Sequence, residues 1–197
     1  MRVMLDTDTP AELTKGSKVR APILATYADL VGAVMLAQLR ASWAQVLLID
    51  RGLGDPLGKA SIIDVERGTH SAADAPAWYD RQHKAGVKYL TVYANRASQG
   101  AANAAMGKRP FYRWIATLDG TAHVPPYAAG TAPAAVQILS AAQLGFHADL
   151  SLVLEPWWQP APAAAPPGAA WVKDALAKVT DTENELELLA KLLAAHQ

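Results

Sequence analysis

The sequence predicts an α/β fold, a compact and reduced (β/α) barrel with its helices mainly around the earlier strands. Two patterns lead to this prediction. Apolar runs of strand length recur through residues 1–158, and most are apolar at nearly every position, which is typical of strands buried on both faces. Helical patterns separate the runs mainly in the first two-thirds of this region. Because a full (β/α)8 barrel typically needs about 250 residues, this one must be economical.

The predicted strands are short and differ from the intervening segments in their density of apolar residues. Since a sheet that alternates with helices is usually parallel, we expect a parallel sheet. Closure of this sheet into a barrel makes its first and last strands neighbours. The eight runs span residues 3–8, 22–27, 46–50, 61–66, 89–94, 112–118, 134–139 and 149–154.

Two helices are expected before the third strand. Thr9-Pro10-Ala11-Glu12 has the cap, the proline and the returning glutamate that are typical of a helix start. Residues 28–40 have helical periodicity, so we predict a second helix there. The apolar residues of its predicted buried face are Val31, Val34, Met35 and Leu39.

Two more helices are expected on either side of the fifth strand. Asp74 is placed to cap a helix that runs through Trp78 to Gly86. Ser98 is placed to cap a helix that ends near Gly107. The gap before the fourth strand and the gaps around the last two strands are too short or too broken to predict good helices.

Composition narrows the classes of partner. The 18 Lys and Arg residues balance the 18 Asp and Glu residues, so nothing indicates a nucleic acid or an anionic membrane surface as partner. Cysteine is absent, which excludes disulfides and thiolate metal sites. Residues 1–6 lack the apolar core of a signal peptide and read as a strand, and no apolar run approaches the length of a membrane span.

A change of composition after residue 158 predicts a second region. Residues 159–168 are rich in Pro and Ala and favour a semi-rigid linker. Residues 169–197 form an amphipathic, coiled-coil-like pattern that predicts a C-terminal helix. This helix would either dock on the barrel, associate with a second copy or bind a partner. Its apolar stripe consists of Val172, Leu176, Val179, Leu186 and Leu193.

The main chemical signal is the pair Asp64 and Glu66 at the end of the fourth predicted strand. Residues two apart on a strand share a face, so both carboxyls point the same way while Ile63 and Val65 point the other way. If Ile63 and Val65 pack beneath helices, the carboxyls enter the barrel at the end where barrel enzymes build their sites. Two carboxyls this close raise the pKa of at least one, as a general acid requires. A solvated pair at the strand rim is the alternative interpretation.

The first and last strands carry acidic residues in the same alternating pattern. Asp6 and Asp8 alternate with Leu5 and Thr7, and Asp149 alternates with Leu150. If the barrel closes, Asp6 and Asp149 become neighbours and converge with Asp64 and Glu66. Carboxylates gathered in one cleft are costly unless a function or a metal retains them.

Six segments carry a resemblance to a known family. In order and spacing they resemble the opening aspartate strand, the Asp-x-Glu strand, the tyrosine strand, the Trp-x-Ala strand, the glutamine strand and the closing aspartate strand of family 25 glycoside hydrolases, the lysozyme-type muramidases. The segments are Val3-Met4-Leu5-Asp6, Ile62-Ile63-Asp64-Val65-Glu66, Thr91-Val92-Tyr93-Ala94-Asn95, Arg113-Trp114-Ile115-Ala116, Ala135-Val136-Gln137-Ile138 and Asp149-Leu150-Ser151-Leu152-Val153.

The resemblance implies a reduced TIM-like barrel over residues 1–158 and a role for each acidic residue. Glu66 would be the general acid and base, and Asp64 would orient the N-acetyl group of the substrate, which attacks the anomeric carbon. Asp6 and Asp149 would hold the hydrogen-bond network of the site. Four residues would contact the sugar: Tyr93, Trp114, Gln137 and Asp8. The resemblance implies neither a metal nor a cofactor.

The sequence also departs from the family pattern. The family's aromatic residues on either side of the glutamine are Val136 and Leu139 here, and the chain before Asp64 is shorter than usual. Arg67 follows Glu66 directly, and pairing between them would lower the pKa of Glu66, the wrong direction for an acid.

Two functional hypotheses follow. In the first, the chain is a peptidoglycan hydrolase; in the second, it is an inactive structural or decoration protein of a virion that uses the barrel as a rigid body and residues 169–197 as a tether. The opening Met4-Leu5-Asp6-Thr7-Asp8-Thr9-Pro10 resembles small barrel proteins encoded by actinobacterial phages, so we expect the protein in a phage particle under either hypothesis.

Three weaker signals were weighed against these hypotheses. Asp6-Thr7-Asp8 resembles the start of haloacid-dehalogenase-like phosphatases, but Pro10 occupies the Thr/Val position and no later Asp-Asp pair exists for magnesium. The five histidines lack the i,i+4 spacing of a metal site. The glycine-rich residues 52–58 lack the Gly-Lys-Ser/Thr of a phosphate loop.

Overall fold

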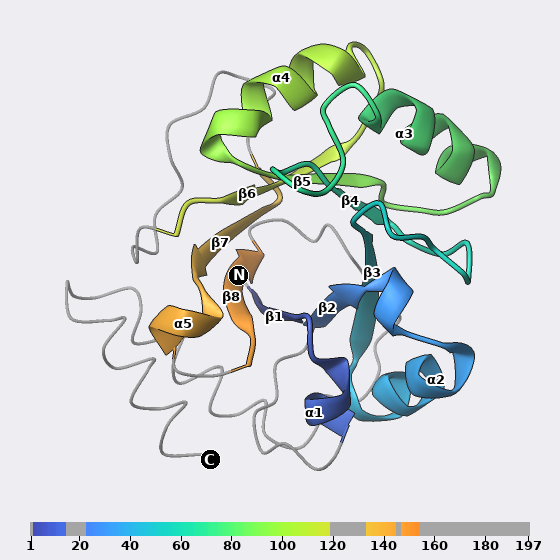
Figure 1. The fold of residues 1–197 in the computed structure, drawn as a ribbon, viewed down its shortest axis with the longest axis vertical. Helices are drawn as coiled ribbons and strands as arrows, with labels where there is room; N and C mark the ends of the chain where they lie inside the picture. Colours follow the sequence, from blue (N-terminus) through green and yellow to red (C-terminus); the bar gives the residue numbers. More distant parts are fainter. Residues whose placement is uncertain (1, 15–22, 119–132, 145–146, 154–197) are drawn as a thin grey trace.

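The computed structural model describes residues 2–14, 23–118, 133–144 and 147–153, and within them eight strands close into a barrel (Figure 1). Each strand lies within one of the eight apolar runs or extends one by a single residue, so the predicted strands are confirmed. They are β1 Arg2–Thr7, β2 Ile23–Tyr27, β3 Gln45–Asp50, β4 Ile62–Asp64, β5 Thr91–Asn95, β6 Tyr112–Ala116, β7 Ala135–Leu139 and β8 Asp149–Val153.

The direction of β8 decides where its acidic residue lies. Strands β1 to β7 follow one another around the barrel as parallel neighbours, whereas β8 is antiparallel to both β7 and β1. The first residue of β8 therefore lies at the end of the barrel where the other strands finish. We call this end the barrel mouth.

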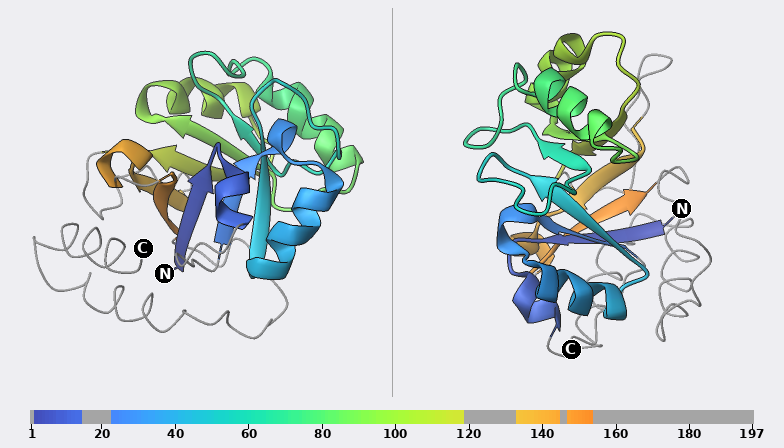
Figure 2. Two further views of the ribbon diagram at one scale, coloured as in Figure 1. Left: turned by 60° about the horizontal axis from the view of Figure 1, so that its bottom comes forward. Right: turned by 90° about the vertical axis from the view of Figure 1, so that its right-hand side faces the viewer.

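The helices cover mainly the earlier strands, as predicted. Helices α1 and α2 lie on the side of β1 to β3, and α3 and α4 lie on the opposite side, against β4 to β6 (Figures 1 and 2). No helix lies between β3 and β4. The helical elements of the described residues are α1 Pro10–Thr14, the 3-10 turn η1 Ala28–Leu30, α2 Ala33–Ser42, α3 Ala75–Lys84, α4 Arg96–Met106 and α5 Ala141–Leu144.

The predicted helix over residues 28–40 is wrong at its start. The chain first makes η1, and α2 begins only after Gly32, whose extended backbone (φ −78°, ψ 171°) separates the two. Because the helix starts later, its buried face differs from the predicted one. Val31 and Leu39 are buried as predicted, but Val34 is 76% exposed and Leu36, which was not predicted, is buried.

Asp74 stands at the N-cap position of α3, as predicted, but its side chain does not cap the helix, and the predicted cap of α4 is wrong. Asp74 has a helical backbone, and its carboxylate accepts hydrogen bonds from the N–H and hydroxyl of Ser71 (2.8 and 2.6 Å) instead of capping α3. The cap of α4 is Asn95, whose Oδ1 accepts from the Ser98 N–H (3.0 Å). Asn95 ends β5 with an extended backbone, as an N-cap requires.

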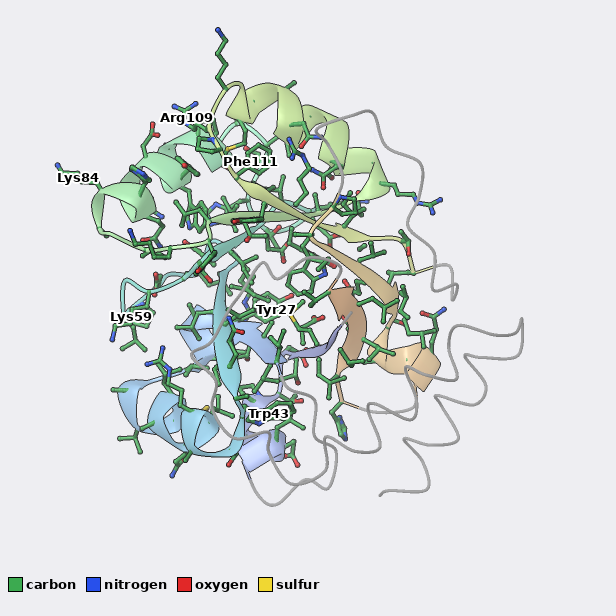
Figure 3. All side chains as sticks on the ribbon, turned by 180° about the vertical axis from the view of Figure 1, so that it is seen from behind. Tyr27, Trp43, Lys59, Lys84, Arg109 and Phe111 are labelled. Carbon is green, nitrogen blue, oxygen red and sulfur yellow. The ribbon has the colours of Figure 1, made fainter. Side chains whose placement is uncertain are left out.

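The apolar core is divided by the barrel wall. Ile63 and Val65 pack outside it with residues of α3 and α4, so the alternating Asp64 points inward, as predicted. The interior cluster contains Met4, Ile62 and Trp114, with Tyr27 packed against it. Figure 3 shows Tyr27 inside the ring of strands and Trp43 outside it.

The second predicted region lies outside the described residues. This applies to the linker at 159–168 and to the coiled-coil-like helix at 169–197. In the part of the chain that is described, no helix has both the length and the apolar character needed to cross a membrane.

Candidate functional site

The barrel mouth brings together the four acidic residues singled out from the sequence. Asp6 of β1 pairs directly with Asp149 of β8 in the antiparallel register. Asp64 ends β4, and Glu66 follows it in the next loop. The negative charges of Asp149, Asp64, Glu66 and Asp8 all act on Asp6, and each raises its pKa. Strand alternation and barrel closure thus place five carboxyl groups in one electrostatic cluster.

Asp6 is the member of this cluster on which the other four carboxyls act. Its side chain is nine-tenths buried, and its Oδ2 has no hydrogen-bond partner among the described residues. Burial is the main reason why the pKa of Asp6 lies well above its ordinary value, and the neighbouring carboxylates add to this. Burial and the neighbouring carboxylates therefore both favour the protonated form of Asp6.

Asp64 and Glu66 differ in their access to solvent. Asp64 is 2% exposed, and burial together with the charge of Glu66 raises its pKa to about 7. Hydrogen bonds from Thr69 and Tyr27 act against this rise. Glu66 is half-buried, and burial raises its pKa, while hydrogen bonds from Asn95 oppose the shift. Of the two, Glu66 is the carboxyl that a substrate can reach.

Arg67 does not lower the pKa of Glu66, as a pairing between the two side chains would have done. Its side chain is exposed, and the pKa of Glu66 is raised rather than lowered. The physical reason is the loop that follows β4, in which the Thr69 hydroxyl accepts from the Glu66 N–H (2.9 Å) and donates to the Asp64 backbone carbonyl (3.0 Å). The chain turns sharply there, and Glu66 continues the inward face of β4.

Asp149 is held by a chain of hydrogen bonds across the last strands. The Tyr93 hydroxyl donates to Gln137 Oε1 (2.5 Å), and Gln137 Nε2 donates to Asp149 Oδ2 (2.6 Å). Asp149 Oδ1 accepts from the Ala141 N–H. Burial raises the pKa of Asp149, and these hydrogen bonds oppose the rise. Burial also raises the pKa of Tyr93, so its hydroxyl stays protonated and donates.

Two of the residues expected to contact sugar lie too deep for this role. Trp114 is fully buried, its Nε1 donates to Ser151 Oγ (3.0 Å), and its ring meets that of Tyr93 edge-on at 4.6 Å. Gln137 is 1% exposed. The interior of so small a barrel is filled by side chains, so these two residues support Tyr93 and Asp149 instead of contacting a ligand.

The mouth also contains a cavity of about 200 Å³ beside Asp6. The exposed Asp8, predicted to bind substrate, lies on its wall. Two other lining residues, Tyr27 and Arg51, were missed from the sequence. Alternation along β2 with Ile23 and Ala25 could have placed Tyr27 inside the barrel. The cavity is lined by Asp6, Thr7, Asp8, Tyr27, Arg51, Ala141, His147, Ala148 and Asp149.

The geometry of the mouth favours acid–base chemistry over metal binding. Among the described residues, no group of three or more His, Asp or Glu side chains is arranged to hold a metal ion. Both Asp149 oxygens already accept hydrogen bonds from protein donors. Carboxyl groups with raised pKa values in a half-closed cleft can donate or accept protons near neutral pH.

Comparisons with known proteins support the fold and give no information about the site. No family model matches the chain, and no match was found among curated proteins. A similar solved structure is the 1.07 Å crystal structure of an uncharacterized protein of B. stearothermophilus, with a TM-score of 0.53 and 15% sequence identity. The match covers 80% of this chain and 98% of that protein. At this identity the likeness shows a shared fold alone.

Proposed function

We propose that the barrel mouth is the active site of a lysozyme-like glycoside hydrolase that acts on the glycan of peptidoglycan. The observation that carries this proposal is the convergence of Asp6, Asp64, Glu66 and Asp149, all with raised pKa values, at the end of the strands where barrel enzymes act. The resemblance of six strand segments to family 25 hydrolases supplies the reaction class, and with it a reduced TIM-like (β/α) barrel.

Glu66 is the proposed general acid. It is the more accessible carboxyl of the Asp64–Glu66 pair, and burial raises its pKa, which favours the protonated form that a general acid needs. In the first step the glycosidic oxygen takes the proton of Glu66 as its bond to the anomeric carbon breaks. The leaving sugar departs as an alcohol, and Glu66 becomes a carboxylate.

Asp64 is the proposed partner of the N-acetyl group of the substrate. The acetamido oxygen forms a bond to the anomeric carbon while the glycosidic bond breaks, and Asp64 orients the amide. The ionised form of Asp64, which the hydrogen bond from Thr69 favours, would balance the developing positive charge. Water then attacks the same carbon, gives a proton to Glu66 and releases the acetamido oxygen. Two displacements at one carbon retain its configuration.

The remaining residues hold the substrate and the carboxyl groups in place. Asp149 belongs to the hydrogen-bond network of the mouth that Gln137 and the partly buried Tyr93 complete, and Asp6 belongs to the carboxyl cluster beside it. Asp8, exposed at the rim, is placed to accept a hydrogen bond from a sugar hydroxyl. No metal or cofactor enters this scheme.

We further propose that the enzyme acts from a phage particle. The support is the resemblance of the opening residues 4–10 to barrel proteins of actinobacterial phages, and residues 169–197 would attach the barrel to other virion proteins or to a second copy. Peptidoglycan, or another glycan of the cell surface, would be the target.

A zymogram against actinobacterial cell walls tests the proposed reaction. The full chain should clear the walls and release new reducing ends, and Glu66→Gln should lower this rate by about 100-fold or more because the proton donor is lost. Glu12→Gln, an exposed change on α1, is the matched control and should clear walls like the wild type. Equal clearing by Glu66→Gln, or none by the wild type, would contradict the proposal.

A second candidate is an inactive barrel that serves as a structural or decoration protein of the virion. The observation in its favour is the burial of Trp114 and Gln137, which leaves no fully exposed aromatic platform among the described residues that line the mouth. This function needs residues 168–197 as a tether. Measuring the mass of the protein in solution with and without these residues tests it. An unchanged association state on truncation would remove self-association.

A further inference from the structure

We propose that Asp50 and His70 position Asp64 and Glu66 from outside the barrel, by fastening the loop after β4 to the end of β3. The inference rests on the proposed glycosidase function, because it explains how the two carboxyl groups of the reaction keep their places. Neither Asp50 nor His70 belongs to the six segments that carry the family resemblance. Both lie outside the set of residues that line the cavity of the mouth.

The sheet supports Asp64 less on its β3 side than on its β5 side. Backbone pairing between β3 and β4 ends with Asp50 and Ile63, one residue before Asp64. Pairing with β5 continues further, to Asp64 and Tyr93, and the Val65 N–H donates to the Tyr93 carbonyl (2.9 Å). No helix follows β3 before β4 begins. The loop after Asp64 therefore depends on side chains for its attachment to β3.

Asp50 and His70 make that attachment. Asp50 ends β3, its side chain is 5% exposed, and its Oδ1 lies 3.0 Å from His70 Nε2. The same Oδ1 accepts from the Gly52 N–H (2.9 Å), and an ionised carboxylate has no proton to donate, so His70 Nε2 is the donor. A Cβ added at Gly52 would lie 3.7 Å from the His70 ring. The ring is thus held by a hydrogen bond and by its place beside the chain that follows β3.

The backbone of His70 extends this attachment to β4. Its N–H donates to the Asp64 carbonyl (3.2 Å), so the fastened residue is also bonded to the last residue of β4. Between them the chain makes a four-residue turn, in which the Thr69 N–H donates to the Glu66 carbonyl (3.3 Å). Gly68, the third residue of the turn, has a φ of 94°, in the left-handed region that favours glycine. Glu66 therefore begins a closed turn whose far end is fixed to β3.

Thr69 links this turn to the two residues of the proposed reaction. Its hydroxyl oxygen accepts from the Glu66 N–H (2.9 Å). Its hydroxyl proton has three acceptors at 3.0 to 3.2 Å and serves one at a time: the Asp64 carbonyl, Asp64 Oδ1 and the Glu66 carbonyl. Because His70 is the next residue in the chain, the bond to Asp50 restrains Thr69, and Thr69 in turn restrains the residues that face the mouth.

His83 provides a matched control for the loss of an imidazole. It lies on α3, it is exposed, and its ring stacks on that of Tyr79 with the ring centres 5.7 Å apart. His83→Phe therefore makes the same exchange of rings as His70→Phe but leaves the bond between Asp50 and His70 in place.

Native-state hydrogen exchange of the full chain, followed by NMR, tests the attachment. The measured quantity is the exchange rate of the Glu66 N–H, which bonds to Thr69, divided by that of the Val65 N–H, which bonds to β5. His70→Phe keeps an aromatic ring but removes the donor to Asp50, and it should raise this ratio roughly fivefold. His70→Gln, whose side-chain amide supplies a donor in place of Nε2, should restore the ratio, and His83→Phe should leave it unchanged.

A purely structural contribution of His70 gives a different result. It would lower the stability of the whole barrel and speed the exchange of both amides by a common factor. An unchanged ratio of Glu66 to Val65 in His70→Phe would therefore overturn the proposal. So would a ratio in His70→Gln as high as that in His70→Phe.

The wild type offers a second test that does not depend on the folding of a variant. Nitrogen-15 spectra of the histidine rings at pH 8 should show a proton on His70 Nε2, because this atom donates to Asp50. A His70 ring protonated on Nδ1 alone would overturn the proposal, since Asp50 would then have no donor on this ring.

Activity separates the proposed positioning from the proposed reaction. If the wild type clears cell walls, His70→Phe should lower the clearing rate per folded molecule about tenfold, because Glu66 loses its fixed place, and His70→Gln should keep most of the rate. Wild-type clearing by His70→Phe would overturn the positioning role. If no protein clears walls but the exchange ratio rises as expected, the attachment of the loop stands and the glycosidase function fails.

Discussion

Two cavities of this barrel each contain a buried aspartate, and the two aspartates differ in their hydrogen bonding. The mouth contains Asp6, whose Oδ2 lacks a partner among the described residues. On the outer side of β3, a second cavity of about 470 Å³ contains the equally buried Asp50. There Oδ1 accepts from the Gly52 N–H (2.9 Å) and lies 3.0 Å from His70 Nε2, and Oδ2 lies 3.5 Å from Arg81.

The difference shows that Asp50 is a structural carboxylate, whereas the burial of Asp6 lowers the stability of the fold. Asp50 ties the loop after β3 to α3 and to the loop after β4, so its burial is compensated by hydrogen bonds and charge. Its neighbour Asp55 is intermediate, since Oδ2 accepts from Ala60 and Gln82 while Oδ1 lacks a partner among the described residues. Asp6 faces four further carboxyls, and this arrangement is typical of a functional site.

The largest effect that sharpens this comparison is the pH dependence of stability. The pKa of Asp64 is raised from 3.8 to about 7, so the folded state binds its proton more tightly than the unfolded state. This contribution is fully present below about pH 4 and is lost as the pH rises through 7. We expect the free energy of unfolding, measured with urea, to fall by about 3 kcal/mol between pH 5 and pH 8 from Asp64 alone.

The raised pKa values of Asp6, Glu66 and Asp149 act in the same direction. The variant Asp64→Asn should therefore flatten the dependence without removing it entirely. A wild-type protein that is equally stable at pH 5 and pH 8, or more stable at pH 8, would show that the mouth carboxyls are not buried together.

The next effect concerns the outer pocket. Asp50→Ala should lower the free energy of unfolding by about 2 kcal/mol, because Gly52 and His70 lose a buried acceptor while the exposed Arg81 is solvated again. Asp74→Ala, at the exposed start of α3, is the control and should have a much smaller effect. A neutral Asp50→Ala would mean that its hydrogen bonds contribute nothing, and the comparison with Asp6 would lose its basis.

The smallest effect should have the opposite sign. At pH 8, Asp6→Asn replaces a carboxyl whose Oδ2 has no partner among the described residues and relieves repulsion from the other carboxyls, so it should raise the free energy of unfolding by about 1 kcal/mol. The same variant should lose lytic activity if the mouth is catalytic. Destabilisation by Asp6→Asn as large as that by Asp50→Ala would assign Asp6 a structural role instead.

Much of the barrel followed from local patterns in the sequence. The inward direction of Asp64 followed from the apolar Ile63 and Val65, whereas the position of Asp149 beside Asp6 depends on the antiparallel direction of β8, which the sequence analysis did not predict. The inference for Asp64 needs only strand alternation, which a sequence displays directly. Apolar runs likewise gave the strands within a residue or two at each end.

The parts that failed depend on contacts between distant segments. The start of α2 depends on the extended backbone of Gly32, and the cap of α4 on the place where β5 ends. The bonds of Arg51 to Asp29 and of Asp50 to His70 join residues about twenty positions apart. The burial of Trp114 reflects how tightly a small barrel fills its interior, which a motif match does not show.

Binding of a glycan fragment to the mouth tests the central claim most directly, because it does not depend on turnover. Amide NMR spectra of Glu66→Gln in the full chain are recorded while a soluble disaccharide–peptide fragment of peptidoglycan is added. We expect the shifted amides to cluster at the mouth, at Asp8, residue 66 and Asp149, with the outer pocket around Asp50 unchanged. Shifts confined to the outer pocket, or no shifts at millimolar fragment, would contradict a glycan site in the barrel mouth.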